Sequence, residues 1–314
     1  MNGEPRLIER IRRKVPLRAQ AGLVLGIGDD CAIFRPRGSR DDLLFTTDLL
    51  LEDVHFRRET HAAAEVGWKT LARGLSDAAA MGGEPRFCLV SLAVAEWAGR
   101  DWIDDFYRGL LRLAARTGTA LAGGDLARNQ RLACDIVVCA AVPRGRALRR
   151  DGARTGDAIY VSGRLGGSAL GLAEGPRGPR TAWRRHVHPE PRLALGAFLR
   201  ERLRATAAID LSDGLALDLH RLCLASQVSA AIEAPPRFPG ATPEQALHGG
   251  EDYELLFTVP PRTRVPARFG LTPLTRIGRI EKGRAGSVFL DGAPLPPLGF
   301  DHFRPSGFDH SAVE

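Results

Sequence analysis

The stretch Gly26-Ile27-Gly28-Asp29-Asp30 sets two adjacent carboxylates directly behind a pair of glycines. Four later segments repeat this chemistry, each with an aspartate beside Gly, Ser or Thr at the end of an apolar run. They are Thr46-Thr47-Asp48, Leu75-Ser76-Asp77, Gly123-Gly124-Asp125 and Ile209-Asp210-Leu211-Ser212-Asp213-Gly214. Oxygen ligands on short side chains suit Mg²⁺, which also shares the phosphates of its substrates. The pattern predicts a site for several magnesium ions and a nucleoside triphosphate.

Apolar runs of strand length and of helical period alternate around these acidic segments. We expect strands at 43–45, 87–95, 136–142, 158–161, 255–259 and 277–280. We expect helices at 64–81, 101–117 and 214–225. Strands and helices mixed in both halves indicate an α/β (α+β) fold of two layered domains, the second an α/β sandwich.

A polar, arginine-rich segment at 143–156 separates the two halves, which predicts domains at 1–145 and 146–314. A chain of 314 residues is long enough for two domains, and its hydrophobic fraction of 44% is that of a soluble globular protein. The richest apolar run, 134–142, is far shorter than a membrane span. The N-terminus is expected to form an amphipathic helix with Leu7, Ile8 and Ile11 inward, not a signal peptide. We therefore expect a cytoplasmic protein with no membrane partner.

Five scattered cysteines form no Cys-x-x-Cys pair, so we expect reduced, buried thiols and no zinc site. The net charge of +7 comes almost entirely from arginine. Because the arginines are spread along the chain without a basic stripe or interleaved aromatic residues, the composition argues against nucleic-acid binding.

Each acidic position also has a local explanation when it is taken alone. Asp77 lies one helical turn after Arg73, Asp213 precedes a helix as an N-cap would, and Asp125 follows two glycines as a turn residue would. Taken together, the carboxylates favour a shared cation, because like charges brought close to one another need one.

Phosphate binding is not carried by a Gly-x-x-x-x-Gly-Lys-Ser/Thr motif, which the chain lacks. Gly163-x-x-Gly166-Gly167-Ser168 resembles a strand–loop–helix phosphate cradle. His55 lies just beyond the Asp48 segment and can donate to an anionic substrate, although a structural role is equally open. Gly249-Gly250-Glu251-Asp252 is either a polar turn or a carboxylate that faces a cationic ligand.

In order and spacing, these segments resemble the thiamine-monophosphate kinase family of the aminoimidazole ribonucleotide synthetase superfamily, over nearly the whole chain. Besides the acidic segments, the resemblance rests on His55-Phe56, Gly145-Arg146-Ala147-Leu148, Gly249-Gly250-Glu251-Asp252-Tyr253-Glu254-Leu255 and Asp301-His302-Phe303. It implies that ATP phosphorylates thiamine monophosphate to thiamine diphosphate with several Mg²⁺ ions. It also implies a homodimer formed through the sheet of the N-terminal domain.

The resemblance also implies residue roles. The magnesium ligands would be Asp30, Thr46, Thr47, Asp48, Asp77, Asp125, Asp210 and Asp213. The ATP contacts would be Gly124, Asp125, Arg146 and Ser212. The substrate contacts would be His55, Glu251 and Phe303, with Phe303 stacked on a ring of the cationic thiamine.

Three positions depart from the family pattern: Gly74 replaces Asn, Leu126 replaces Thr, and Asp53 replaces a small residue. Leu126 removes a possible polar contact to the nucleotide. Asp53 adds negative charge near His55, which is expected to raise the pKa of that histidine.

The chemistry that is implied needs no general base. The acceptor is a phosphate monoester with a second pKa of about 6, so its attacking oxygen is already ionised. The obstacle is repulsion between phosphates, about 4 kcal/mol for two charges ~4 Å apart at an effective dielectric of 20. Divalent ions offset it, which predicts in-line transfer without a phospho-enzyme. The alternatives are a synthetase of the aminoimidazole ribonucleotide type and a non-catalytic nucleotide sensor.

Overall fold

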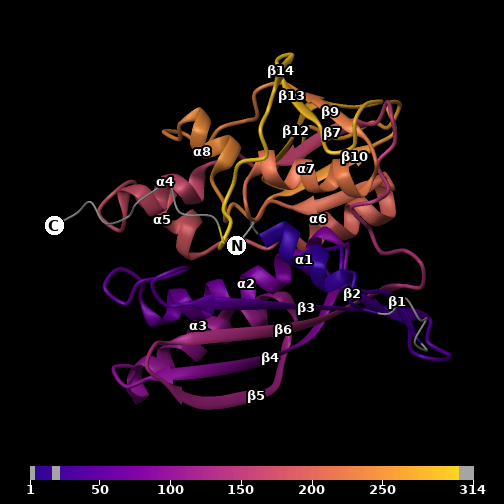
Figure 1. Cartoon of the computed structure of the whole chain (residues 1–314). Helices are drawn as coiled ribbons and strands as arrows, with labels where there is room; N and C mark the ends of the chain where they lie inside the picture. The colour runs from indigo at the N-terminus through magenta and orange to yellow at the C-terminus, as the bar shows by residue number, and fades with distance from the viewer. Residues whose placement is uncertain (1–3, 16–21, 304–314) are drawn as a thin grey trace.

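The computed structural model describes residues 4–15 and 22–303 and shows two lobes, each built around one sheet (Figure 1). The N-terminal sheet has the strand order β1-β2-β3-β6-β4-β5, and its pairs are antiparallel except β4 with β5. The strands are β1 (Leu23–Leu25), β2 (Ala32–Phe34), β3 (Asp41–Leu51), β4 (Glu84–Ala95), β5 (Ala120–Asn129) and β6 (Ala133–Pro143). Helices α2 (Ala63–Ala80) and α3 (Arg100–Thr117) cover one face of this sheet.

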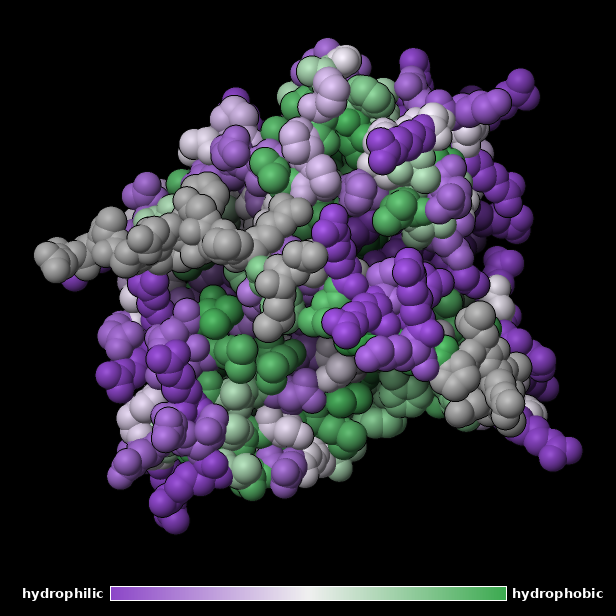
Figure 2. Space-filling model, viewed as in Figure 1, coloured by the Kyte–Doolittle hydropathy of each residue, from purple (hydrophilic) through white to green (hydrophobic). Residues whose placement is uncertain are grey.

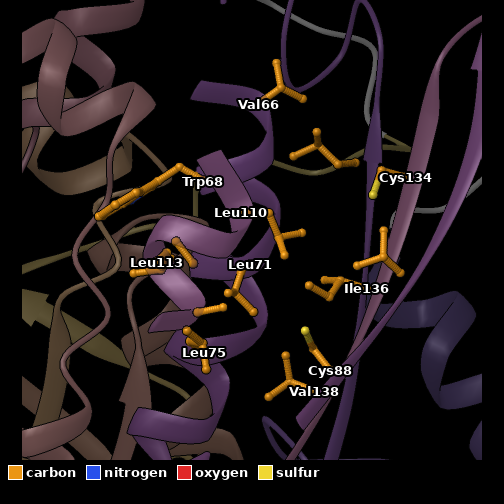
Figure 3. Close-up of a cluster of buried hydrophobic side chains, with 14 of the residues drawn as sticks. Val66, Trp68, Leu71, Leu75, Cys88, Leu110, Leu113, Cys134, Ile136 and Val138 are labelled. Carbon is orange, nitrogen blue, oxygen red and sulfur yellow. The ribbon is translucent and has the colours of Figure 1, made fainter. Parts of the chain in front are cut away.

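The core of this lobe lies between the two helices and the sheet (Figure 3). Leu71 and Leu110 from the helices meet Ile136 and Val138 from β6. The two helices pack backbone to backbone, since a Cβ added at Gly67 would come 1.9 Å from the Phe106 carbonyl oxygen. At Gly74 an added Cβ would come 2.7 Å from Val138 Cγ2, so α2 also lies directly on β6. This close packing leaves no room at position 74 for a longer side chain, such as the asparagine that the resemblance implies, unless β6 shifts.

The C-terminal sheet has the order β14-β13-β9-β12-β7-β10-β8, with β11 paired to β12. Its strands are β7 (Ala158–Ser162), β8 (Ala207–Asp210), β9 (Ser229–Ile232), β10 (Leu255–Val259), β11 (Arg268–Phe269), β12 (Thr272–Glu281), β13 (Val288–Leu290) and β14 (Ala293–Pro294). The helices are α4 (Gly167–Glu174), α5 (Arg180–Val187), α6 (Leu193–Phe198), α7 (Leu215–Ala225) and α8 (Pro243–His248), and a π-helical turn, Leu199–Leu203, follows α6. The predicted class of two mixed α/β domains is confirmed.

The two lobes join along α2. Leu195 and Leu199 pack with Leu255 and Phe257 of the C-terminal sheet and with Ala79 of α2 in one buried cluster. A Cβ added at Gly196 would come 2.0 Å from the Ala79 carbonyl oxygen, so α6 and α2 touch through their backbones. Helix α2 is thus shared by both lobes, and side chains near its end face both.

Helix α1 (Glu4–Arg12) lies at the junction of the lobes (Figure 1). The backbone N–H of Glu4 donates to the Asp301 carboxylate at 3.1 Å, which ties the first helix to the end of the described chain. Leu7 is half-buried, but Ile8 and Ile11 are 42% and 46% exposed. The prediction that both isoleucines point inward is therefore wrong, because no other described element covers that side of α1.

All five cysteines are buried and free, as predicted. Among the described helices, none is long and apolar enough to cross a membrane.

Candidate active site

Three carboxylates from distant parts of the chain meet where the lobes join. Asp30 lies between β1 and β2, Asp77 in the last turn of α2, and Asp210 at the end of β8. Each offers an oxygen that lies within 4.8 Å of the other two. The acidic segments at 26–30, 75–77 and 209–214 thus converge on one point, which we call the acidic cluster (Asp30, Asp77 and Asp210).

Hydroxyl groups orient two of these carboxylates. Ser76 Oγ donates to Asp210 Oδ2 at 2.6 Å, and Thr46 Oγ1 on β3 donates to Asp77 Oδ2. Both donors come from segments that also carry an acidic residue. The Ser and Thr beside the aspartates therefore fix the direction in which the neighbouring carboxylates point.

The acidic cluster has more negative charge than the protein neutralises. Burial, reinforced by Asp48 and Asp210, raises the pKa of Asp77 well above its usual range. Burial and Asp30 do the same to the pKa of Asp210. The cationic partner of Asp30 is Arg150, yet Asp30 Oδ2 stays buried without a hydrogen bond. Hard, converging oxygen donors with an unpartnered oxygen and excess charge fit a divalent cation such as Mg²⁺.

Asp48 and Asp213 form the rim of the cluster. Arg73 Nη2 donates to Asp48 at 3.1 Å, and Arg221 pairs with Asp213. Burial raises the pKa of Asp48, Arg73 opposes this shift, and Asp213 adds to it. The carboxylates of Asp48 and Asp213 are therefore close enough to repel one another. The local pairing of Asp77 with Arg73 is wrong, because Arg73 turns to Asp48 instead.

Asp213 is also not an N-cap. The Asp218 carboxylate accepts from the backbone N–H groups of Asp213 and Gly214 at 3.0 and 3.1 Å and so caps this helix start from within α7. The Asp213 carboxylate is thereby left facing Arg221 and Asp48 rather than its own backbone.

Thr47 and Asp125 lie on the other face of the N-terminal sheet. Thr47 Oγ1 donates to Asp135 Oδ1 at 2.7 Å, on the side of β3 opposite to Asp48. Asp125 is exposed on β5, three strands from β3 and so roughly 14 Å across the sheet. With Leu49 and Asp135 it lines a shallow hollow of about 180 Å³. Within one chain, these two side chains do not join the acidic cluster.

The remaining residues predicted to bind the nucleotide are dispersed. Gly124 precedes Asp125 on β5, with a φ of 156° and no room for a Cβ, which would come 1.8 Å from the Val90 carbonyl oxygen. Arg146 is exposed on the turn after β6, whereas Arg150, which sequence reasoning missed, is the arginine at the cluster. The Ser212 carbonyl accepts from the Glu251 N–H at 2.7 Å, which links the Asp210 turn to the proposed substrate side.

A second buried group surrounds Lys69 of α2. Lys69 Nζ donates to the His55 carbonyl at 3.2 Å and lies 2.9 Å from the Glu251 carboxylate and 3.5 Å from His186 Nε2. Burial raises the pKa of Glu251, but Lys69, His186 and Arg73 outweigh it and bring the pKa to about 2. Glu251 therefore already has a cation in the protein, an internal partner that the sequence did not indicate.

His55 is buried and neutral. Its Nδ1 accepts from the Leu51 N–H at 3.0 Å, which leaves the proton on Nε2. Burial and then Arg73 lower its pKa to about 3. The expectation that Asp53 raises this pKa is wrong, because Asp53 turns to Arg131, 3.2 Å away at the surface.

The aromatic rings beside His55 come from the end of the described chain. Phe300 and His302 have ring centroids 6.3 and 5.1 Å from that of His55. Phe303, the residue predicted to stack on substrate, is 38% exposed, and its N–H donates to Asp301 Oδ1 at 2.9 Å. Phe300 and His302, and not Phe303, are thus the aromatic residues whose rings contact His55 within the described part of the chain.

The glycine-rich turn before α4 is not an open phosphate cradle. Asp252 accepts from the N–H groups of Gly166 at 2.6 Å and Ser168 at 3.2 Å, so a carboxylate of the chain fills this helix start. The predicted cradle at 163–168 is therefore wrong, and the turn instead anchors the 249–252 segment, which carries Glu251.

Known proteins are similar to this chain in sequence and in fold. The family models "AIR synthase related protein, N-terminal domain" and "AIR synthase related protein, C-terminal domain" match residues 28–142 and 154–291. Thiamine-monophosphate kinase of Escherichia coli (strain K12) is 38% identical over 326 residues, 96% of this chain and 98% of that protein. The chain belongs to the thiamine-monophosphate kinase family. The resemblance inferred from the motifs is thereby confirmed.

Solved structures agree with membership of the thiamine-monophosphate kinase family. "AaThiL complexed with AMPPCP and TMP" has a TM-score of 0.84 at 33% identity and covers 96% of this chain and 97% of its own. The thiamine-monophosphate kinase of Stenotrophomonas maltophilia K279a has a TM-score of 0.73 at 38% identity, covering 91% and 96%. The predicted enzyme class, a kinase, is confirmed.

Proposed function

We propose that this chain transfers a phosphoryl group from ATP to thiamine monophosphate, giving thiamine diphosphate, with several Mg²⁺ ions. The observation that carries the proposal is the acidic cluster, with three carboxylate oxygens mutually within 4.8 Å and one oxygen unpartnered. The kinase relatives and the neighbour complexed with AMPPCP and TMP support the choice of substrates. A cytoplasmic location and a domain boundary near residue 145 belong to the same proposal.

In this proposal Asp30, Asp77 and Asp210 would hold magnesium, with Thr46, Asp48 and Asp213 completing the set. When bound, magnesium supplies positive charge that offsets phosphate–phosphate repulsion. Ser212 and Arg146 would contact the nucleotide. His55 would donate a hydrogen bond from its Nε2–H to the substrate, while Glu251 and Phe303 would line the pocket for the cationic part of the substrate.

Direct in-line transfer is the step these residues favour, because the acceptor oxygen is ionised near neutral pH. The thiol next to the cluster, Cys31, is a poor nucleophile, since burial and the neighbouring Asp77 and Asp30 raise its pKa well above its usual range. We therefore expect no phosphorylated side chain in acid-quenched reactions.

The test is an assay with ATP, magnesium and thiamine monophosphate. We expect one thiamine diphosphate per ADP, and at least ~100-fold lower kcat/KM for Asp48→Ala, which removes a rim carboxylate where charge develops. Release of free phosphate without thiamine diphosphate would assign the synthetase reaction instead. Magnesium-dependent ATP binding without turnover would assign a sensor.

A homodimer accounts for the positions of Thr47 and Asp125. The face of the N-terminal sheet opposite α2 and α3 is not covered by any described helix, and it exposes Leu49 (50%) and Leu89 (37%). Figure 2 shows hydrophobic residues gathered over the lower lobe, where Figure 1 places β4 and β6. Apolar surface of this kind marks a protein contact. We propose that a second copy covers this face and that its Asp125 and Gly124 serve the neighbouring subunit's nucleotide.

Mixed dimers test this sharing. If Asp48 and Asp125 of different subunits form one site, a mixed dimer of Asp48→Ala and Asp125→Ala chains, isolated through two affinity tags, keeps one intact site. We expect it to show about half of the wild-type kcat, while both parent homodimers are nearly inactive. The matched control pairs Asp48→Ala with Asp210→Asn, two defects in the same site region, and should stay inactive. An inactive Asp48→Ala/Asp125→Ala dimer would assign Asp125 to the site of its own chain, and a fully active Asp125→Ala homodimer would remove Asp125 from the site altogether.

A further inference from the structure

A hollow of about 440 Å³ lies between the lobes, where α3 faces α5. Arg112 and Arg116 stand one turn apart on α3, and Arg180 and Arg184 stand one turn apart on α5, so each pair shares a helix face. Neither the acidic cluster nor the Lys69–Glu251 pair lines this space. Four guanidinium groups from two lobes therefore converge on a place that the proposed reaction does not use.

The charge of this hollow is not balanced. Its carboxylates are Glu65 and Glu190. Glu190 pairs with Arg116 at 2.8 Å, and Glu65 accepts from the Ala62 N–H at 2.9 Å at the start of α2. Across residues 4–15 and 22–303, Arg112, Arg180 and Arg184 have no carboxylate within 4.0 Å. Four guanidinium groups against two carboxylates leave an excess of two positive charges.

Two of the arginines are held in place by an indole ring. The guanidinium carbons of Arg112 and Arg116 each lie 5.0 Å from the ring centroid of Trp68. Trp68 is buried, donates from Nε1 to the Pro189 carbonyl at 2.9 Å, and points to the side of α2 away from Cys134 (Figure 3). Cation–π contact with a fixed ring restrains both side chains before any ligand arrives, which lowers the entropy cost of binding.

His188 also lines the hollow, as an uncharged side chain. Its Nε2 lies 3.1 Å from Arg112 Nη2, and its ring meets Trp68 edge-on with centroids 5.3 Å apart. Burial, followed by Arg112 and Arg184, lowers the pKa of His188 to about 4. The imidazole therefore accepts a hydrogen bond from Arg112 without adding charge, and the guanidinium keeps its other donors for a ligand.

We propose that this hollow binds a small anion that carries a diphosphate or triphosphate group. The planar guanidinium fork matches phosphate oxygens in a bidentate manner, and two uncompensated charges suit a diphosphate better than a neutral ligand. The volume falls within the range of about 300–1,000 Å³ that small-molecule sites occupy. Inorganic pyrophosphate, a nucleoside diphosphate and a thiamine diphosphate all share this group.

Such an anion bridges α3 to α5. Helix α5 also carries His186, whose ring lies 3.4 Å from the Glu251 carboxylate. An occupant of the hollow therefore holds the helix that packs against the proposed substrate side, from a position outside the acidic cluster.

Calorimetric titration with inorganic pyrophosphate in EDTA tests the site, because without divalent ions the acidic cluster repels the probe. We expect binding by the wild-type protein and at least tenfold weaker binding by Arg112→Gln/Arg184→Gln, a change of about 1.4 kcal/mol or more. The matched control Arg108→Gln/Arg177→Gln removes the same charge from the neighbourhood of the same helices but outside the hollow, and should bind like wild type. The four substituted arginines, Arg108, Arg112, Arg177 and Arg184, are exposed, so both double variants should keep the wild-type melting temperature without ligand.

Titrations with ADP and thiamine diphosphate under the same conditions identify which diphosphate-bearing molecule the hollow prefers. Similar affinities for all three would mean that the diphosphate alone is recognised, and tighter binding of one would name the preferred ligand; each must weaken in Arg112→Gln/Arg184→Gln. Absence of pyrophosphate binding by the wild type, or equal weakening in both double variants, overturns the proposal. Because no turnover is measured, this result is independent of the proposed kinase reaction.

Discussion

Asp77→Asn is expected to lower kcat/KM by at least ~1,000-fold, or about 4 kcal/mol of transition-state stabilisation. The amide keeps an oxygen that can accept from Thr46 Oγ1, so the local structure is retained while one charge of the acidic cluster is lost. We expect the loss in the transfer step because the Asp77 carboxylate interacts electrostatically with those of Asp48, Asp210 and Asp30. Steady-state kinetics with ATP, magnesium and thiamine monophosphate measure it.

A second readout separates this explanation from simple damage to the fold. Without magnesium, the buried like charges repel, so Asp77→Asn should melt at a higher temperature than the wild type. With magnesium, the wild type should gain stability by ligand linkage, and the variant should gain much less. Asp101→Asn, on the exposed first turn of α3, is the control and should change neither value. A variant less stable than wild type without magnesium would contradict a repulsive cluster.

Lys69→Met is expected to destabilise the protein by about 3 kcal/mol, the lower end for breaking a buried ion pair. Lys69 is fully buried, whereas the Glu251 side chain keeps 22% exposure, and this exposure moderates the cost. Methionine retains the length of the side chain but leaves the carboxylate without its nearest cation. Urea denaturation at pH 7 measures the free energy of unfolding, with Lys282→Met at the surface as the control.

The Lys69–Glu251 pair also predicts how the free energy of unfolding changes with pH. The folded pKa of Glu251, about 2, lies below its usual value of 4.5, so its contribution to stability is present above pH 4.5 and is lost as the pH falls towards 2. In Lys69→Met, burial acts with fewer opposing charges, and this acid-induced loss should shrink. Adding Glu251→Gln to Lys69→Met should recover most of the lost stability. If the double variant is as unstable as Lys69→Met alone, Lys69 acts through packing and not through charge.

Much of the architecture could be predicted because it depends on local patterns. The helix at 64–81 and the strands at 136–142 and 255–259 have clear periodicity and turn signals, and all three occur within a few residues of the expected bounds. The convergence of Asp30, Asp77 and Asp210 could also be predicted, because several carboxylates beside Gly, Ser or Thr are best explained by one shared cation, although they lie far apart in the sequence.

The features that could not be predicted depend mostly on tertiary contacts. Successive side chains of a strand point to opposite faces, so the separation of Thr47 from Thr46 and Asp48 was a usable local signal. That Asp125 lies three strands from β3 follows from strand order, which the sequence does not encode locally. The glycine turn at 163–168 looked open because its occupant, Asp252, comes from 84 residues further along. Lys69 was missed, although a lysine next to Trp68 on an apolar helix face in a chain with only three lysines was a usable signal.

Helix α2 directs three side chains to three different surroundings: Trp68 towards the arginine hollow, Lys69 towards Glu251, and Asp77 towards the other carboxylates. One inserted or deleted residue in its middle would rotate everything beyond it by about 100° and shift it by 1.5 Å. The glycines that seat it on α3 leave no slack to absorb such a turn. Length variation in descendants of this gene should therefore be confined to the connecting loops, while the span from Ala63 to Ala80 keeps a fixed number of residues.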